Sequence, residues 1–254
     1  MKKLRLIVFD WDGTLADSVD SIIQCKQYLA QQYNLPEPSH LLIKEVLGTE
    51  FSQAMARCFP TVEKNLLDQL GQEFKQRMQE APQARLFPGA MDVLNALKKK
   101  GIKLAVATSK SRMELTKALA YTQLENFFDD TCCAEEYQPK PDPAMLNHLL
   151  ERYAVNAHEC LMLGDTTSDI DFATQAQVPV ICVTFGAHSQ AHLRQKNPFA
   201  FIDQWDQLLS ILENQINALP SQSEIMENNL FSQDLEEYDD KQNSNKNPTV
   251  LNIS

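Results

Sequence analysis

Four short, unbroken apolar runs constrain the fold of this chain more than any other feature of its sequence. They lie at residues 4–9, 102–107, 160–163 and 178–183 and are rich in Val, Ile and Leu. Continuous runs of this length are typical of strands that are covered on both faces, as in a parallel sheet. Helical patterns lie between the last three runs, so strand and helix alternate from about residue 88 to residue 212. This alternation predicts an α/β fold built on a parallel sheet.

The segment between the first and second runs has a different pattern, which is helical throughout. Apolar side chains recur at helical spacing in residues 19–33, 51–59 and 62–78, with no strand pattern between them. Pro88 and Gly89 are typical of a turn that returns the chain to the sheet. We therefore expect a core made of residues 1–15 and 85–214 and an inserted helical cap at residues 16–84.

The charge of the chain is negative and unevenly spread. With 34 acidic and 23 basic side chains, the net charge is −11, which argues against nucleic acid or an anionic membrane as a partner. Residues 215–254 hold seven acidic side chains and two lysines and lose the apolar periodicity, so we expect an acidic, disordered tail whose partner is unknown. No apolar stretch approaches the roughly 18 residues of a membrane helix. The six scattered cysteines show no disulfide or zinc pattern, and we expect a cytoplasmic protein.

Polar side chains follow three of the four apolar runs. Ligands of parallel sheets bind outside the carboxyl ends of the strands, so we expect these side chains to meet at one edge. Taken singly, each has an ordinary structural explanation, such as a helix cap for an aspartate or a solvated surface charge for a lysine. Their joint occurrence favours a functional site. The candidate residues are Asp10, Asp12, Thr108, Ser109, Lys140, Asp165 and Asp169.

The four aspartates of this set predict a metal ion. Asp10 and Asp12 are two residues apart and would point to the same side of an extended segment. With Asp165 and Asp169 opposite, these carboxylates would repel one another unless a cation lay between them. Oxygen ligands of this kind suit Mg²⁺, which leaves coordination positions for water and a substrate phosphate. Lys140 would then supply positive charge to the remaining phosphate oxygens.

The four motifs resemble those of the haloacid dehalogenase-like (HAD) superfamily of hydrolases. The DxDGT motif matches residues 10–14, and the strand ending in Thr or Ser matches Thr108. The lysine of KPxP matches residues 140–143, and GDxxxDI matches residues 164–170. The order and the helical insertion are similar to the phosphoglycolate phosphatase-like group. This resemblance implies a Rossmann-like core with a helical cap and a small phosphate ester as substrate.

The resemblance also implies a role for each residue. Asp10 would attack phosphorus and form an aspartyl-phosphate. Asp12 would protonate the leaving alcohol and then accept a proton from water. The phosphoryl oxygens would be held by Thr108, Ser109 and Lys140. The Mg²⁺ ligands would come from Asp10, Asp12 through its backbone carbonyl, Asp165 and Asp169.

Several alternatives remain open at this point. A dehalogenase of the family needs no acid at the position of Asp12, so phosphate chemistry is favoured. A sugar phosphomutase similar to β-phosphoglucomutase shares the four motifs, and a sugar-phosphate or nucleotide phosphatase would differ little in sequence. In the cap, Lys44 or Arg57 could meet a remote anion of the substrate. A receiver-type phosphorylation switch is disfavoured by the length and the insertion, and a non-catalytic interaction protein is disfavoured by the intact motifs.

Overall fold

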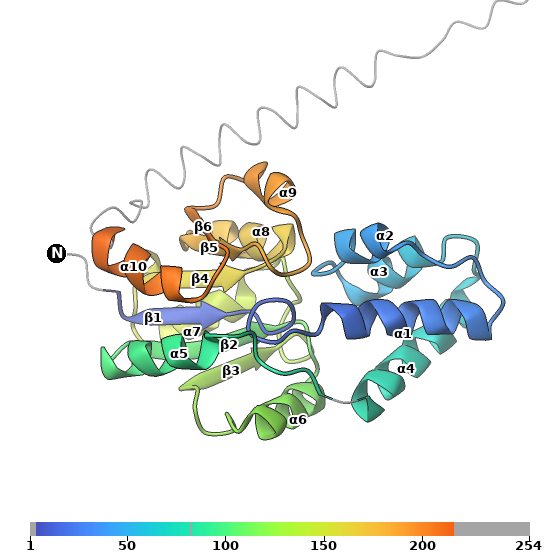
Figure 1. The fold of residues 1–254 in the computed structure, drawn as a ribbon, viewed down its shortest axis with the longest axis horizontal. Helices are drawn as coiled ribbons and strands as arrows, with labels where there is room; N and C mark the ends of the chain where they lie inside the picture. Colours follow the sequence, from blue (N-terminus) through green and yellow to red (C-terminus); the bar gives the residue numbers. More distant parts are fainter. Residues whose placement is uncertain (1–3, 82, 216–254) are drawn as a thin grey trace, which may run out of the picture.

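One six-stranded parallel sheet forms the centre of the structure, a computed structural model that describes residues 4–81 and 83–215. The strand order is β3-β2-β1-β4-β5-β6, so the first strand of the chain lies between β2 and β4 in the middle of the sheet (Figure 1). The expected parallel α/β fold is therefore confirmed. The strands are β1 Leu6–Phe9, β2 Lys103–Thr108, β3 Asp130–Cys133, β4 Cys160–Gly164, β5 Val180–Val183 and β6 Ala200–Ile202.

The sequence pattern predicted β1, β2, β4 and β5 but not the two edge strands, β3 and β6. The edge strands are only four and three residues long. The sequence of β3, Asp-Thr-Cys-Cys, contains no apolar run. Its register with β2, from Ala105 opposite Asp130 to Thr108 opposite Cys133, identifies it as a strand. Such a pairing is a tertiary feature that periodicity alone does not reveal.

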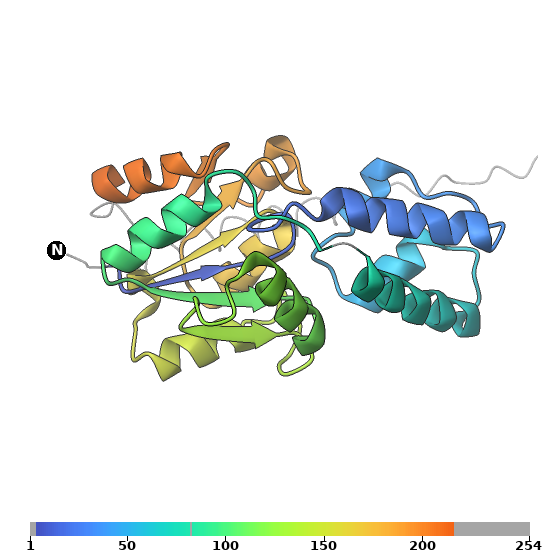
Figure 2. The ribbon, with the colours of Figure 1, turned by 60° about the horizontal axis from the view of Figure 1, so that its bottom comes forward.

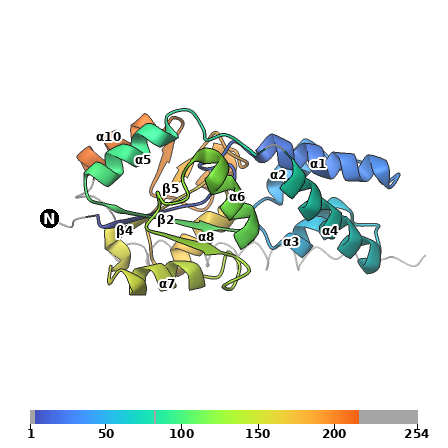
Figure 3. The same cartoon turned by 90° about the horizontal axis from the view of Figure 1, so that it is seen from below.

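Helices cover both faces of the sheet. In β1, Ile7 and Phe9 join one apolar cluster with α5, α6 and α10, whereas Leu6 and Val8 join the other with α7, α8 and α9 (Figure 3). This alternation explains the continuous apolar runs, because both sides of each central strand are buried. The helices are α5 Ala90–Lys99, α6 Arg112–Thr122, α7 Ala144–Arg152, α8 Thr167–Gln175, α9 Gln190–Arg194 and α10 Asp206–Gln215, with a 3₁₀ turn, η1, at Ala157–Glu159.

A helical cap, the name used here for α1–α4, lies between β1 and α5 in the sequence and beside the carboxyl ends of the strands in space (Figure 2). It has its own apolar cluster, to which α1 contributes Leu29, α2 Ile43 and α4 Leu70. The sequence pattern did not anticipate α2, which the Ser39 side chain caps by accepting a hydrogen bond from Leu42 N. The cap helices are α1 Val19–Gln32, α2 His40–Glu45, α3 Phe51–Cys58 and α4 Lys64–Glu80.

The chain enters and leaves the cap through two connectors that lie side by side (Figure 2). Asp17 N donates to the carbonyl of Arg85 at 2.9 Å, and Phe87 N donates to the carbonyl of Leu15 at 2.9 Å. An isolated bridge pairs Ala16 with Leu86 between these two bonds. The cap is therefore attached to the core at one short, hydrogen-bonded crossing.

Two further expectations concern the ends and surface of the chain. The predicted acidic tail at residues 215–254 lies outside the described residues, apart from Gln215 at the end of α10. Within the described ranges, none of the helices combines the length and the apolar character that crossing a membrane requires. All six cysteines are free thiols.

Candidate active site

Three neighbouring strands deliver the candidate residues to one edge of the sheet. Asp10 directly follows β1, Thr108 ends β2, and Asp165 directly follows β4. In the register of the sheet, Phe9 lies opposite Val106 on one side and Leu163 on the other, so these ends are adjacent. Burial is nearly complete, with 8% exposure for Asp10 and 1% or less for Thr108 and Asp165. The predicted convergence of these side chains is thus seen in the structure.

Lys140 joins two carboxylates of the site. Its Nζ donates to Asp10 Oδ1 and to Asp169 Oδ1, both at 2.7 Å, and its side chain is 2% exposed. Burial lowers the pKa of Lys140, but the two carboxylates outweigh burial and hold the pKa above its ordinary value. The ammonium is therefore charged, and it links β1 to the first turn of α8.

Asp10, Asp165 and Asp169 form a buried acidic triad, with one oxygen of each within 4.8 Å of the others. Burial raises the pKa of Asp10 to about 7 even though Lys140 opposes the shift. Burial, followed by the charges of Asp169 and Asp10, raises the pKa of Asp165 well above its usual range. Three carboxylates thus face one ammonium in a dry site. This surplus of hard oxygen ligands fits a small divalent cation.

The remaining oxygens of the triad are oriented by neutral donors. Asp165 Oδ1 accepts from Thr14 Oγ1 at 2.9 Å and Oδ2 accepts from Ala187 N at 2.7 Å. Asp169 Oδ2 accepts from the hydroxyl of Thr166 at 2.8 Å. These bonds fix the direction in which each carboxylate presents its free lone pairs. Thr14 is a site residue that we did not predict, although it stands within the DxDGT motif.

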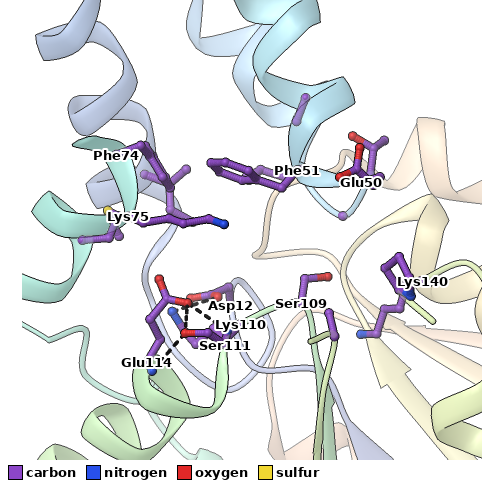
Figure 4. A pocket seen from close by; sticks show the side chains of 18 of the residues that line it. Asp12, Glu50, Phe51, Phe74, Lys75, Ser109, Lys110, Ser111, Glu114 and Lys140 are labelled. Carbon is purple, nitrogen blue, oxygen red and sulfur yellow. Dashed lines mark hydrogen bonds and ion pairs between the residues drawn. The ribbon is translucent and has the colours of Figure 1, made fainter. Parts of the chain in front are cut away.

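Asp12 lies outside the triad and has different partners. Ser18 Oγ donates to Asp12 Oδ1 at 2.6 Å, and Lys110 Nζ lies 3.0 Å from Oδ2. Neither partner was predicted, although Lys110 directly follows Ser109. The Asp12 side chain is therefore free of the triad and faces the space under the cap (Figure 4). Its predicted contact with a metal through the backbone carbonyl stays a prediction.

Two residues beside the aspartates show why the first motif has its sequence. Gly13 has a φ of +77°, and a Cβ there would lie 2.2 Å from Asp165 Oδ2. Only glycine allows this close approach of the backbone to the second aspartate. Trp11 points into the core instead, with 1% exposure and its ring edge-on to Phe128 at 6.5 Å. This position agrees with the packing role expected for Trp11.

Two adjoining cavities open onto the site. The smaller, of about 80 Å³, is lined by the triad with Thr108, Ser109 and Lys140. The larger, of about 330 Å³, extends from Asp12 and Ser109 into the cap. The cap loop closes over the smaller cavity at Gly48, where a Cβ would lie 2.4 Å from Thr166 Oγ1. The site thus has a narrow end at the aspartates and a wide end in the cap.

The structure does not support the expected role of Lys44 and Arg57 as contacts of the substrate. Neither residue lines the two cavities, and Arg57 forms an ion pair with Glu45 at 2.6 Å. The cap lysines that line the larger cavity are Lys26 and Lys75. Lys26 could have been found, because it interrupts the apolar face of α1.

Sequence comparisons place this site among known hydrolases. The family model described as haloacid dehalogenase-like hydrolase matches residues 7–183. Probable phosphatase IndB of Dickeya dadantii is 30% identical over 210 residues, covering 80% of this chain and 91% of that protein. Phosphoglycolate phosphatase of Haemophilus influenzae is 28% identical over 221 residues, covering 83% of this chain and 99% of that protein.

Solved structures share the fold. A predicted phosphoglycolate phosphatase from Haemophilus somnus superposes with a TM-score of 0.76 at 24% identity, covering 83% of this chain and 99% of that one. A haloacid dehalogenase-like family protein from Streptococcus pneumoniae gives a TM-score of 0.74 at 22% identity, covering 84% of this chain and 100% of that one. Both match the core and the cap together, since each is covered almost completely.

Proposed function

The chain belongs to the haloacid dehalogenase-like hydrolase family, and from that premise we propose that it is a Mg²⁺-dependent phosphatase acting on a small phosphomonoester. The observation that carries the proposal is the ammonium of Lys140, held 2.7 Å from both Asp10 and Asp169 beside Thr108. This arrangement offers a carboxylate nucleophile, a surplus of negative charge for a cation, and donors for phosphoryl oxygens within one cavity of about 80 Å³.

The triad fits Mg²⁺ because its ligands are buried carboxylates with unshared charge. Asp10 and Asp165 would hold the ion through their side chains and Asp12 through its backbone carbonyl, with Asp169 contributing directly or through water. When bound, Mg²⁺ would offset the negative charge of the phosphate and so ease the approach of an anionic nucleophile.

The chemistry is proposed to run in two steps. Asp10 attacks phosphorus, the ester P–O bond breaks, and Asp12 gives its proton to the leaving alcohol, which leaves an aspartyl-phosphate. Water then attacks that phosphorus and Asp12 takes a proton from it, which frees Asp10 and inorganic phosphate. The phosphoryl oxygens are held throughout by Thr108, Ser109 and Lys140.

Phosphoglycolate is the substrate that we propose first, because curated relatives named phosphoglycolate phosphatase match over nearly their whole length. Residues 1–15 and 85–214 would carry the chemistry, and residues 16–84 would cover it. The partner is then a small phosphate ester, and a cytoplasmic location stays a prediction from the sequence. A sugar phosphomutase, or a sugar-phosphate or nucleotide phosphatase, is the alternative that the experiment below separates.

The test is phosphate release from a panel of esters with and without Mg²⁺. The panel contains phosphoglycolate, glucose 1-phosphate, glucose 6-phosphate and mononucleotides. We expect Mg²⁺-dependent release that falls by at least about 10³-fold in Asp10→Asn, because the amide is no nucleophile. Asp68→Asn, an exposed change on α4, is the matched control. Isomerisation of a glucose phosphate without phosphate release would instead identify a mutase.

A further inference from the structure

Two lysines of the cap face the larger cavity. Lys26 comes from α1 and Lys75 from α4, and both line the space of about 330 Å³ that begins at Asp12 and Ser109. In Figure 4, Lys75 points from the cap side toward this space, with Asp12 and Ser109 on the opposite side. The two cations thus lie on the side of the cavity away from the nucleophile.

Lys26 is buried without a charged partner. Its residue is 2% exposed, and its Nζ contacts the thiol of Cys58 at 3.5 Å and lies 6.0 Å from the ring centre of Phe74. Within residues 4–81 and 83–215, no carboxylate lies within 4.0 Å of this Nζ. Burial lowers the pKa of Lys26, which shows that the folded environment disfavours its charge. A residue so costly to the fold is explained if an anion enters the cavity beside it.

Lys75 provides a second cation at the mouth of the cavity. Its side chain is exposed, and its Nζ lies 4.8 Å from the ring centre of Phe51. The structure gives it no ion pair among the residues that it describes. Phe51 and Phe74, whose ring centres are 5.6 Å apart, form an apolar wall next to both lysines.

The acidic residues of the cavity are already engaged with backbone donors. Glu50 accepts from Ser52 N and Gln53 N at the start of α3. Glu114 accepts from the backbone of Ser111, and Glu135 accepts from that of Arg112 at 2.7 Å. The carboxylates therefore cap helices, whereas the two lysines remain available to a ligand.

We infer that Lys26 and Lys75 form a subsite for a second anionic group on the leaving alcohol, a carboxylate or a second phosphate, whose carbon skeleton packs on Phe51 and Phe74. The inference rests on the proposed phosphatase activity, which places the reacting phosphate at the narrow end. It makes the preferred substrate a dianionic ester and assigns the preference to residues of the cap. Lys44 and Arg57 have no part in this subsite.

The test compares esters that differ only in the second charge. Phosphoglycolate carries a carboxylate where 2-hydroxyethyl phosphate carries a neutral hydroxymethyl group, and ethane-1,2-diol bisphosphate carries a second phosphate. We expect Lys26→Met to lower the kcat/KM ratio of an anionic ester over the neutral ester by about 10- to 100-fold, as the loss of a charged hydrogen bond does. Whichever anionic ester loses this preference identifies the second group as carboxylate or phosphate.

Two further variants guard the interpretation. Lys75→Met should lower the same ratio by roughly 3-fold, since its charge is solvated. Lys64→Met, at an exposed position on the same helix and outside the cavity, should leave the ratio unchanged. The Tm of Lys26→Met should equal or exceed that of the wild type, because methionine fills the space without a buried charge.

Equal loss on charged and neutral esters in Lys26→Met, or no change in the ratio, would overturn the inference. If the wild type hydrolyses no ester, the proposed function fails, and calorimetric binding of phosphoglycolate and of the bisphosphate still tests the subsite. In that case we expect roughly 10-fold weaker binding of at least one of them in Lys26→Met than in the wild type. Binding unaffected by Lys26→Met, or absent in the wild type, would overturn the subsite as well.

Discussion

The buried charges of single residues are unbalanced at the aspartate end of the site. Asp10, Asp165 and Asp169 surround the ammonium of Lys140, and all four side chains are nearly inaccessible to water. Without a cation, at least one carboxylate must keep a proton or bear uncompensated charge, as the raised pKa of Asp165 indicates. The metal-free protein therefore contains local strain that binding of a cation relieves.

This imbalance predicts an opposite effect of one substitution on two properties. In Asp165→Asn, the side-chain oxygen can still accept from Ala187 N, and the new amide group can donate to the hydroxyl of Thr14. We expect the Tm of the metal-free variant to equal that of the wild type or exceed it by about 2–5 °C, because repulsion in the triad is removed. The rise in Tm that Mg²⁺ causes in the wild type should be lost. Thermal unfolding in EDTA and in Mg²⁺ measures both.

Asp68→Asn, on the exposed side of α4, serves as the control and should retain the response to Mg²⁺. A metal-free Asp165→Asn protein that unfolds well below the wild type would show that the Asp165 carboxylate stabilises the fold by its hydrogen bonds more than repulsion destabilises it. A normal Tm rise with Mg²⁺ in that variant would remove Asp165 from the metal site.

The elements show what the sequence could and could not predict. The central strands and the site residues at their ends were predictable, because strands buried on both faces leave unbroken apolar runs and parallel strands bring their carboxyl ends together. The edge strands β3 and β6 and the short helix α2 were not, since their existence depends on tertiary pairing and capping. The cap contacts failed for a related reason. Spacing alone did not distinguish exposed Arg57, paired with Glu45, from buried Lys26.

The cap loop between α2 and α3 offers a test at the scale of elements. Gly48 has a φ of +83°, and a Cβ there would lie 2.4 Å from Thr166 Oγ1 and 3.1 Å from Ser168 Cβ. We expect Gly48→Ala to push the loop away from the N-terminus of α8 and to reduce kcat/KM by roughly 10-fold, since a small misplacement of the substrate slows the reaction strongly. Steady-state kinetics on the best ester measures the effect.

A matched control exists for the backbone strain itself. Gly89 has the same φ of +83°, and a Cβ there would make only an ordinary contact at 3.4 Å with Trp205. Gly89→Ala should therefore lose a similar, modest amount of stability, about 1 kcal/mol, while kcat/KM stays near that of the wild type. Equal kinetic losses in the two variants would show that contact between the loop and α8 has no part in activity.

At the scale of the whole molecule, the chain extends beyond its relatives. The Haemophilus influenzae phosphoglycolate phosphatase is covered over 99% of its length by 83% of this chain. The Streptococcus pneumoniae structure is covered completely by 84% of it. The core and the cap therefore account for the length that these proteins share with this one. The acidic segment from residue 219 onward, which carries most of the charge of the predicted tail, has no assigned part in the reaction.

We accordingly expect deletion of residues 219–254 to leave kcat and KM on the best ester within about twofold of the wild type, because both cavities are lined by residues before position 170. The net charge would become less negative, and elution from an anion exchanger would shift to lower salt. The kinetics of the full and shortened chains, measured side by side, test this expectation. A marked loss of kcat in the shortened chain would mean that the tail acts on the cap or the core.

The crossing where Asp17 bonds to Arg85 and Leu15 to Phe87 has a consequence for how such a protein can be altered. Since both ends of the insertion meet at one bridged pair, the helices between them form a cassette whose replacement asks nothing of the sheet except that two neighbouring chain ends be joined. Grafting the cap of a relative between these positions should transplant selectivity while the recipient keeps its reaction. One gene can thus acquire a new substrate by exchanging a single internal segment.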